Sequence, residues 1–280
     1  MLGLFALVGA NLPGHENRET REMLVIAHRG FSSMAPENTL PAFELALDAG
    51  AGLVELDYHA SADGVPIVIH DHSLRRTTNA EQVFGAGDWL VTGVTAAELG
   101  KLDAGAWFDP RFAGAKLPRL DEALALIRAR GGVALVERKS GRAAGLARLL
   151  LDSGFGDEVV VQSYDWEFLR ELHRLLPGLR LAALGPTARL GGRLLEDREK
   201  WLDLAWFDEI ERTGATIVVW NRWLEPTAVE AAHARGLKVW VYGVEDAAGI
   251  LSLRDMGVDG VITSDPARMR EIVRPERVAP

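Results

Sequence analysis

The chain has 280 residues, enough for one large domain or two small ones, and about 250 residues already make a β/α barrel. Its net charge of −9 argues against nonspecific nucleic-acid binding, because such binding requires a basic surface. With no cysteine, disulfides and thiolate chemistry are excluded. We therefore expect no nucleic-acid partner and a cytoplasmic location, with a secreted or periplasmic location left open.

Residues 1–23 predict an N-terminal tail ahead of the folded domain. Met1 to Ala10 is apolar, but it lacks a basic start and is too short to span a bilayer. We favour a disordered tail or a short packed helix over a cleaved signal peptide. No later apolar run approaches about 20 residues, so we expect no stable membrane insertion.

Four short apolar runs in the first half of the chain end in reactive side chains. The runs are Leu24 to Gly30, Leu53 to Asp57, Pro66 to Asp71, and Val133 to Lys139. Each run predicts a buried strand. Because successive side chains of a strand alternate faces, Glu55 and Asp57 share one side, as do Glu137 and Lys139. Apolar strands with polar residues at their carboxyl ends are typical of a β/α barrel.

The rest of the chain alternates predicted helices and strands, which indicates a parallel sheet. We expect helices over Arg142 to Ser153, Trp166 to Leu176, Trp201 to Arg212, Pro226 to Arg235, and Asp246 to Met256. We expect strands over Val159 to Ser163, Arg180 to Leu184, Thr216 to Trp220, Lys238 to Tyr242, and Gly260 to Thr263. This makes nine candidate strands for eight barrel positions. The weakest are Arg180 to Leu184 and Thr216 to Trp220. The barrel is expected to cover residues 24–274, followed by a C-terminal tail at 275–280.

Two segments interrupt this alternation. His72 to about Leu117 has no strong period and is rich in glycine, and we expect it to rise over the active-site face as an insertion. Pro186 to Lys200 carries four arginines and lysines. For this second segment we favour a solvated loop over a lip that steers anions.

Three carboxylates are expected to converge at the carboxyl ends of the strands. Glu55, Asp57 and Glu137 offer only oxygen ligands, which suit a hard cation such as Mg²⁺ or Ca²⁺. The alternative is that these carboxylates form salt bridges with Arg29 and Lys139. The sequence does not choose between the two cations.

Two histidines end different apolar runs. His28 and His70 can act as general base and general acid on the two sides of a bond, although a single histidine at a strand end is more often structural. Arg29 and Lys139 add positive charge that can hold a phosphate or simply balance the carboxylates. The remaining histidines fit surface or structural roles better: His15, His59, His72, His173 and His233.

These motifs together resemble the glycerophosphodiester phosphodiesterase family. The matching segments are His28-Arg29-Gly30, Ala35-Pro36-Glu37-Asn38-Thr39, Glu55-Leu56-Asp57, His70-Asp71, Glu137-Arg138-Lys139, Leu74-Arg75-Arg76-Thr77-Thr78, Leu102-Asp103-Ala104-Gly105, Leu117 to Glu122, Gln162-Ser163-Tyr164-Asp165, and Gly257 to Thr263. The similarity runs from about Val25 to Pro266, nearly the whole chain.

The resemblance implies a fold, an activity and a set of roles. The fold would be an α/β TIM barrel with an insertion after the third strand, at about 72–117. The activity would be hydrolysis of a small-molecule glycerophosphodiester to glycerol 3-phosphate and an alcohol through a cyclic phosphate. It implies one divalent cation, Mg²⁺ or Ca²⁺, on Glu55, Asp57 and Glu137, proton transfer by His28 and His70, and phosphate contacts from Arg29 and Lys139, with Glu37 in a supporting place in the substrate site.

Three positions depart from the family pattern. The family's Trp-Thr-Val-Asn is here Tyr242-Gly243-Val244-Glu245, so the glycerol pocket that Tyr242 is expected to line can differ. Arg138 replaces an isoleucine, faces away from the site and needs a partner. Ser264 extends a Thr-Asp pair, which we expect to alter loop anchoring alone.

Two alternatives to this activity are kept. One is lysophospholipase D-type hydrolysis of a lipid phosphodiester. It is suggested by the change at Tyr242 to Glu245 and by the apolar residues Trp89, Trp107 and Phe108 in the insertion, although we favour a small core for these three side chains. The less favoured one is a catalytically silent barrel that binds anions. The sequence does not indicate the oligomeric state or the leaving alcohol.

Overall fold

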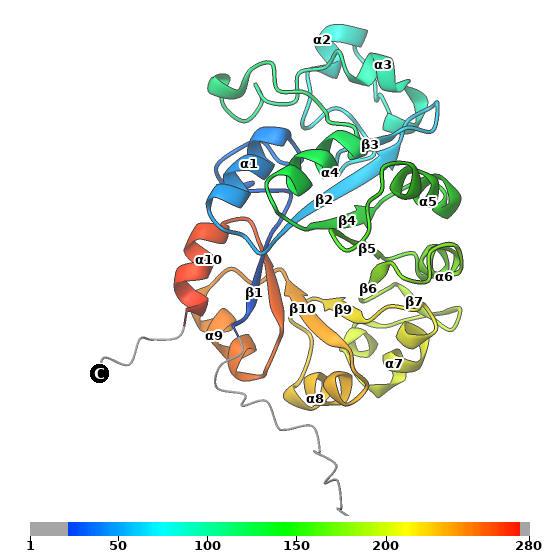
Figure 1. Ribbon diagram of the computed structural model, residues 1–280, viewed down its shortest axis with the longest axis vertical. Helices are drawn as coiled ribbons and strands as arrows, with labels where there is room; N and C mark the ends of the chain where they lie inside the picture. The colour runs from blue at the N-terminus through cyan, green and yellow to red at the C-terminus, as the bar shows by residue number, and fades with distance from the viewer. Residues whose placement is uncertain (1–21, 275–280) are drawn as a thin grey trace, which may run out of the picture.

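Eight parallel strands close into a barrel in the computed structural model, which describes residues 22–274 (Figure 1). Around the barrel the order is β1-β11-β10-β9-β6-β5-β4-β2, and β1 pairs with β2 to complete the circle. The fold class expected from the sequence is confirmed, while most of the two expected tails lies outside the described residues. The strands are β1 (Leu24–Ala27), β2 (Leu53–Ala60), β4 (Ala134–Arg138), β5 (Val159–Ser163), β6 (Arg180–Leu184), β9 (Ile217–Trp220), β10 (Lys238–Tyr242) and β11 (Gly260–Thr263).

One helix follows each barrel strand and covers its outer face (Figure 1). These helices are α1 (Leu40–Asp48), α4 (Leu120–Ala129), α5 (Ala143–Asp152), α6 (Trp166–Leu175), α7 (Leu204–Glu211), α8 (Pro226–Ala234), α9 (Ala247–Asp255) and α10 (Pro266–Val273). The expected helices agree within one residue at most ends. The helix expected from Trp201 begins instead at Leu204, because the side chain of Asp203 accepts a hydrogen bond from the backbone N–H of Ala205 and caps the first turn.

Two apolar cores hold the barrel together. Side chains such as Ile26, Leu135 and Val160 fill the interior, and no part of them is exposed. A larger core lies between the strands and the helices, where the rings of Trp206 and Trp220 meet edge to face. Because every barrel strand is buried on both faces, each one reads as a nearly continuous apolar run in the sequence.

The strand that is extra to the barrel is β3 (Pro66–Val68). It pairs antiparallel with the end of β2, with Tyr58 opposite Val68. The two candidates named as weakest, Arg180 to Leu184 and Thr216 to Trp220, are instead the barrel strands β6 and β9, so that expectation was wrong. The sequence did not distinguish β3 from a barrel strand, because Ile67 and Ile69 are buried against a second core. Burial alone does not reveal the direction of a strand.

The insertion follows β3, the third strand of the chain, and has that second core. Its apolar side chains include Leu74, Val91, Leu99 and Leu102. The core is covered by α2 (Ala80–Phe84), α3 (Ala96–Leu99) and two 3₁₀ turns at Val91–Gly93 and Pro110–Phe112.

The aromatic residues of the insertion pair with each other. Trp89 packs on Phe84, and Phe108 lies between Trp107 and Phe112. Trp89 and Trp107 nevertheless remain 36% and 40% exposed, so these aromatic pairs lie at the surface of the insertion and not within its buried core.

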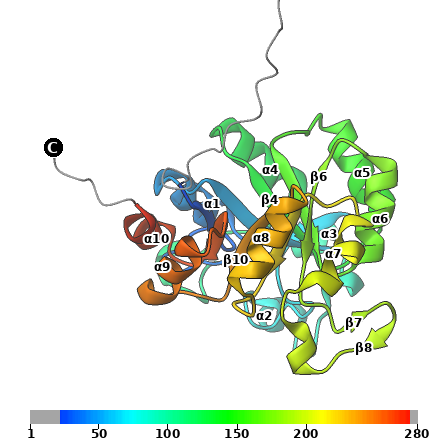
Figure 2. The ribbon, with the colours of Figure 1, turned by 90° about the horizontal axis from the view of Figure 1, so that it is seen from below.

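The second irregular segment folds into a short hairpin, β7 (Arg189–Leu190) and β8 (Arg193–Leu194), followed by a 3₁₀ turn at Asp197–Lys200. Figure 2 shows this hairpin and α2 at the same end of the barrel. Three of its four cations pair with nearby carboxylates, which favours a solvated loop over an anion-steering lip. The pairs are Arg193 with Glu199, Arg198 with Glu196, and Lys200 with Asp197.

Candidate active site

Three carboxylates meet at the carboxyl end of the barrel, as the sequence predicts. Glu55 and Asp57 lie on β2, and Glu137 on β4 is in register with Asp57. The exposed fractions are 1% for Glu55, 1% for Asp57 and 7% for Glu137. One oxygen of each lies within 4.8 Å of the other two. Within residues 22–274 this is the one cluster of at least three acidic or histidine side chains close enough to hold a metal ion.

The charges of this cluster are only partly balanced by Arg29 and Lys139. Burial, with the charges of Asp57 and Glu137, holds the pKa of Glu55 well above its usual range. Burial and Asp57 likewise raise the pKa of Glu137 to about 7. For Asp57, burial opposes ionisation, but the charges of Lys139 and Arg29 outweigh it and lower the pKa. Buried oxygen ligands with surplus negative charge are the donor set that a hard divalent cation requires.

Arg29 and Lys139 both contact the carboxylates. Lys139 pairs with Glu137 and lies 3.2 Å from Asp57. The Nε of Arg29 lies 3.3 Å from Asp57, and its backbone N–H donates to Glu55 at 2.8 Å. Arg29 adopts a φ of 54°, a left-handed conformation uncommon for a side chain of this size, which aims its backbone N–H at Glu55. The charge-balancing role is therefore present in the structure.

His28 follows β1 directly. Its backbone N–H donates to the carbonyl of Thr263, and its own carbonyl accepts from the hydroxyl of Ser32. Burial and the neighbouring charge of Arg29 lower the pKa of His28 to about 4. The imidazole is therefore neutral at pH 7 and can accept a proton.

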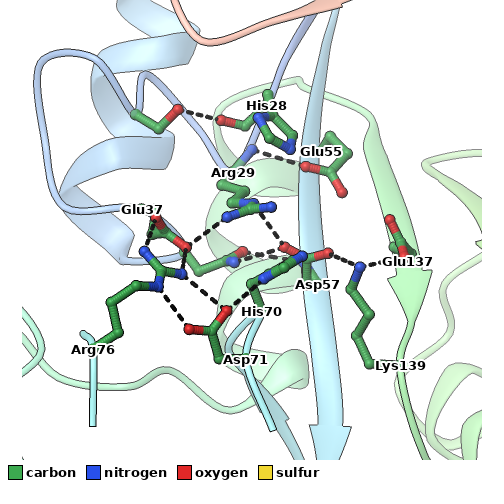
Figure 3. A network of polar contacts seen from close by, with 12 residues as sticks. His28, Arg29, Glu37, Glu55, Asp57, His70, Asp71, Arg76, Glu137 and Lys139 are labelled. Carbon is green, nitrogen blue, oxygen red and sulfur yellow. Dashed lines mark hydrogen bonds and ion pairs between the residues drawn. The ribbon is translucent and has the colours of Figure 1, made fainter. Parts of the chain in front are cut away.

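His70 reaches the same site from the hairpin that β3 forms with β2. Its Nδ1 lies 2.7 Å from Asp71 Oδ1, and Asp71 accepts two hydrogen bonds from Arg76 (Figure 3). The hydrogen bond from Arg76 keeps the pKa of Asp71 well below its usual range, so Asp71 is a carboxylate and His70 Nδ1 carries the proton. The Nε2 of His70 is the ring nitrogen left for the substrate.

His59 supports the backbone of His70. Its Nε2 donates to the carbonyl of His70 at 3.0 Å, and its Nδ1 accepts from the hydroxyl of Ser140 at 3.2 Å. This agrees with the structural role that the sequence suggests for His59.

Two polar residues of the site were not assigned roles from the sequence. Asn38 is buried, donates from Nδ2 to Asp57 at 2.8 Å and accepts from the backbone N–H of Asp57. Gln162 on β5 is in register with Glu137 and only 2% exposed, yet its side-chain oxygen accepts no hydrogen bond from the described residues. For Gln162 the available signal was a polar side chain two residues after Val160, on the side of β5 that faces the barrel interior.

Glu37 does not stand free in the site. Its carboxylate accepts hydrogen bonds from Arg29 at 2.8 Å and from two nitrogens of Arg76 at 2.7 and 2.8 Å. Glu37 is thus a bridge between two arginines. Arg76, which lies in the insertion, was also not assigned a role from the sequence.

Tyr242 ends β10 at the barrel mouth. Its hydroxyl donates to the carbonyl of Gly185 at 3.0 Å and accepts from the hydroxyl of Tyr164 at 2.9 Å. Burial raises the pKa of Tyr242, so its hydroxyl stays protonated. These contacts join the ends of β5, β6 and β10 at the site.

The other two departures from the family pattern also have structural explanations. Glu245 accepts from the hydroxyl of Thr263 at 2.6 Å and from the backbone N–H of Ser264 at 3.0 Å, so it ties the loop after β10 to the end of β11. Arg138 donates to the carbonyl of Gly141 and to Asp165, and its guanidinium lies over the ring of Phe168. Of the partners that the sequence could not identify, Gly141 lies in the loop after β4 itself, whereas Asp165 and Phe168 belong to the next β/α unit.

Comparison with known proteins agrees with this geometry. A family model described as the glycerophosphoryl diester phosphodiesterase family matches residues 28–268. A glycerophosphodiester phosphodiesterase from Caldanaerobacter subterraneus is 31% identical over 257 residues, which cover 90% of this chain and 98% of that protein.

Solved structures are also similar. A glycerophosphodiester phosphodiesterase from Agrobacterium tumefaciens is 32% identical with a TM-score of 0.72, over 89% of this chain and 99% of that one. A phosphodiesterase from Oleispira antarctica, in complex with the product sn-glycerol-3-phosphate, is 26% identical with a TM-score of 0.78, over 91% of this chain and 98% of that one. In residues 22–274, no helix combines the length and the apolar character that crossing a bilayer requires.

Proposed function

Because the chain belongs to the glycerophosphoryl diester phosphodiesterase family, and is thus a phosphoric diester hydrolase, we propose that it cleaves glycerophosphodiesters to glycerol 3-phosphate and an alcohol. The observation that carries this proposal is the convergence of Glu55, Asp57 and Glu137 with two histidines at one barrel mouth. The glycerol 3-phosphate bound to the Oleispira antarctica relative supports the choice of product.

One divalent cation, Mg²⁺ or Ca²⁺, would be held by Glu55, Asp57 and Glu137. The fit rests on three buried oxygen donors within 4.8 Å of one another and on the raised pKa values of Glu55 and Glu137, which indicate surplus negative charge. Such a cation supplies Lewis acidity, which acidifies a bound hydroxyl and offsets charge on the phosphate.

The two histidines move the protons. His28 is neutral at pH 7 and takes the proton of the substrate hydroxyl next to the esterified carbon. That oxygen forms a bond to phosphorus, the bond to the leaving alcohol breaks, and protonated His70 gives its Nε2 proton to that alcohol. Water then opens the resulting cyclic phosphate with the two roles reversed.

Four further side chains bind the substrate in this proposal. Arg29 and Lys139 contact the phosphate oxygens from the same edge as the carboxylates. Tyr242 ends β10 and Gln162 lies on β5. The unpaired side-chain oxygen of Gln162 can accept a hydrogen bond from a glycerol hydroxyl. Glu37 acts in support by holding Arg29.

An activity panel tests the proposal. Purified protein would be incubated with glycerophosphodiesters and lysophospholipids in Mg²⁺, Ca²⁺ or EDTA, and release of glycerol 3-phosphate would be measured. We expect turnover of glycerophosphodiesters that EDTA abolishes and that is absent in Glu55→Ala and His28→Ala. Glu44→Ala, which removes an exposed carboxylate on α1, is the matched control. Turnover that survives in Glu55→Ala contradicts the metal site, and turnover of lysophospholipids alone contradicts the substrate.

A further inference from the structure

The side chain of His70 is held by loops, whereas the cation ligands lie on barrel strands. β3 carries the chain to His70, and Ile69 donates its backbone N–H to the backbone carbonyl of Asp57 at 3.0 Å. Beyond this point the chain enters the insertion. The direction of the imidazole therefore depends on its hydrogen bond to Asp71.

Asp71 is in turn held by Arg76. The Nε of Arg76 donates to Asp71 Oδ2 at 2.6 Å, and its Nη2 donates to Oδ1 at 3.1 Å. The same guanidinium donates through Nη1 and Nη2 to both oxygens of Glu37, at 2.8 and 2.7 Å. One arginine of the insertion thus grips two carboxylates that lie 34 residues apart in the chain, at positions 37 and 71 (Figure 3).

Both carboxylates lead directly to residues of the proposed reaction. Asp71 contacts the imidazole of His70, and Glu37 contacts the guanidinium of Arg29 at 2.8 Å. Only a planar guanidinium has the donors to satisfy two carboxylates in fork geometry, and a lysine ammonium lacks that shape.

We propose that Arg76 is a positioning residue for the phosphodiester reaction. It fixes Asp71 against His70, so that Nδ1 keeps its proton and Nε2 faces the reacting oxygen, and it fixes Glu37 against Arg29. An ordered insertion is thereby a condition for an aligned site. The inference rests on the proposed function only for the use of His70 in proton transfer.

The kinetic test compares two adjacent arginines of the insertion. Arg76→Gln removes the double grip, and we expect kcat to fall about 10- to 100-fold, as for other displaced catalytic groups, with KM changed less than about 3-fold. Arg75→Gln is the matched control. It removes the same charge, but Arg75 pairs with Glu81 and contacts neither Asp71 nor Glu37. We expect Arg75→Gln to stay within about 2-fold of the wild type.

A second readout needs no substrate. Proton–nitrogen correlation spectra of the histidine rings, with His70 assigned from His70→Gln, report which ring nitrogen carries the proton. We expect a fixed Nδ1–H form of His70 in the wild type and in Arg75→Gln, and averaged shifts of exchanging forms in Arg76→Gln. If no protein, wild type included, is active but the spectra change as expected, the proposed function fails while the positioning of the His70 ring by Arg76 stands. An unchanged ring state in a folded Arg76→Gln overturns it.

Two further variants guard against simple misfolding. Arg76→Lys keeps the charge and should recover only part of kcat. In the double variant Asp71→Asn with Arg76→Gln, the two losses should not add, because Arg76 acts on His70 through Asp71. If Arg76→Lys recovers the full kcat, or if the losses of kcat in the double variant are strictly additive, the hydrogen bonds of Arg76 are not the cause of the loss.

Discussion

The two halves of the site are built in different ways. Glu55, Asp57 and Glu137 stand on adjacent strands, are almost completely buried and carry the same charge. Strands that are paired on both sides can hold like charges together, since the backbone has nowhere to relax. This half therefore keeps a surplus of negative charge, which is useful only if a cation arrives.

The other half lies on loops and neutralises itself. Glu37 and Asp71 alternate in space with Arg29 and Arg76, and the side chains are more exposed, up to 44% for Arg76. The alternating charges hold these loops against one another. In this site the barrel strands hold the excess negative charge, while the loops orient the side chains around it.

The largest effect is expected from the strand-held half. Glu55→Gln keeps an acceptor for the N–H of Arg29 but removes one of the clustered charges. We expect kcat/KM to fall about 10³-fold or more, because several kcal/mol of cation catalysis are lost. We also expect the rise in unfolding temperature on adding Mg²⁺ or Ca²⁺ to disappear, measured by scanning calorimetry against EDTA. If the unfolding temperature of Glu55→Gln still rises when the cation is added, Glu55 is not needed to bind the cation.

The next effect concerns the first proton transfer. His28→Asn should lower kcat about 10²- to 10⁴-fold. The base must be neutral, and burial lowers the pKa of His28 to about 4, so kcat/KM should fall only as the pH drops toward 4. A pH–rate profile at saturating cation checks this. An acid limb near pH 6.5 would contradict the assignment of His28 as base.

A smaller effect should come from outside the barrel mouth. Arg138→Leu removes the contacts of Arg138 with Gly141, Asp165 and Phe168, and we expect the free energy of unfolding to fall by about 1–3 kcal/mol. Arg148→Leu, on an exposed face of α5, is the control and should change it by less than about 1 kcal/mol. Urea unfolding compares the two. Equal losses would mean that the end of β4 does not depend on this anchor.

The smallest effect is expected at the two tyrosines. Tyr164→Phe removes one donor to Tyr242, while Tyr242→Phe also loses the bond to Gly185. One hydrogen bond is worth about 0.5–1.5 kcal/mol, so KM should rise about 2- to 10-fold, and more in Tyr242→Phe than in Tyr164→Phe. Steady-state kinetics with one glycerophosphodiester decide. A larger rise in KM in Tyr164→Phe than in Tyr242→Phe would indicate that Tyr164, and not Tyr242, contacts the substrate.

The sequence predicted what depends on local pattern. Apolar runs placed β10 and β11 at their observed bounds, and alternation correctly put Glu55 and Asp57 on one side of β2. In contrast, the direction of β3 depends on its partner strand. The run around Ile67 looks like any buried strand, because the insertion has its own core.

The contacts of two arginines also could not be predicted from local sequence pattern. Arg76 meets Glu37 across 39 residues, and Arg138 meets Asp165 across 27. Neither pair leaves a periodic trace in the sequence, and Arg76 lies in a segment with little periodicity of any kind.

The antiparallel course of β3 has a consequence for which parts of the chain can change length. The turn at 61–65 joins β2 to β3 and is closed by hydrogen bonds between Ser61 and Val65. One residue added here and carried into the pairing would slide His70 by about 3.3 Å along β2 and turn it to the opposite face. Near Gly85 and Gly93, where surrounding space is open, added residues would project into solvent. We therefore expect natural length variation to gather at the tip of the insertion and to avoid this short turn.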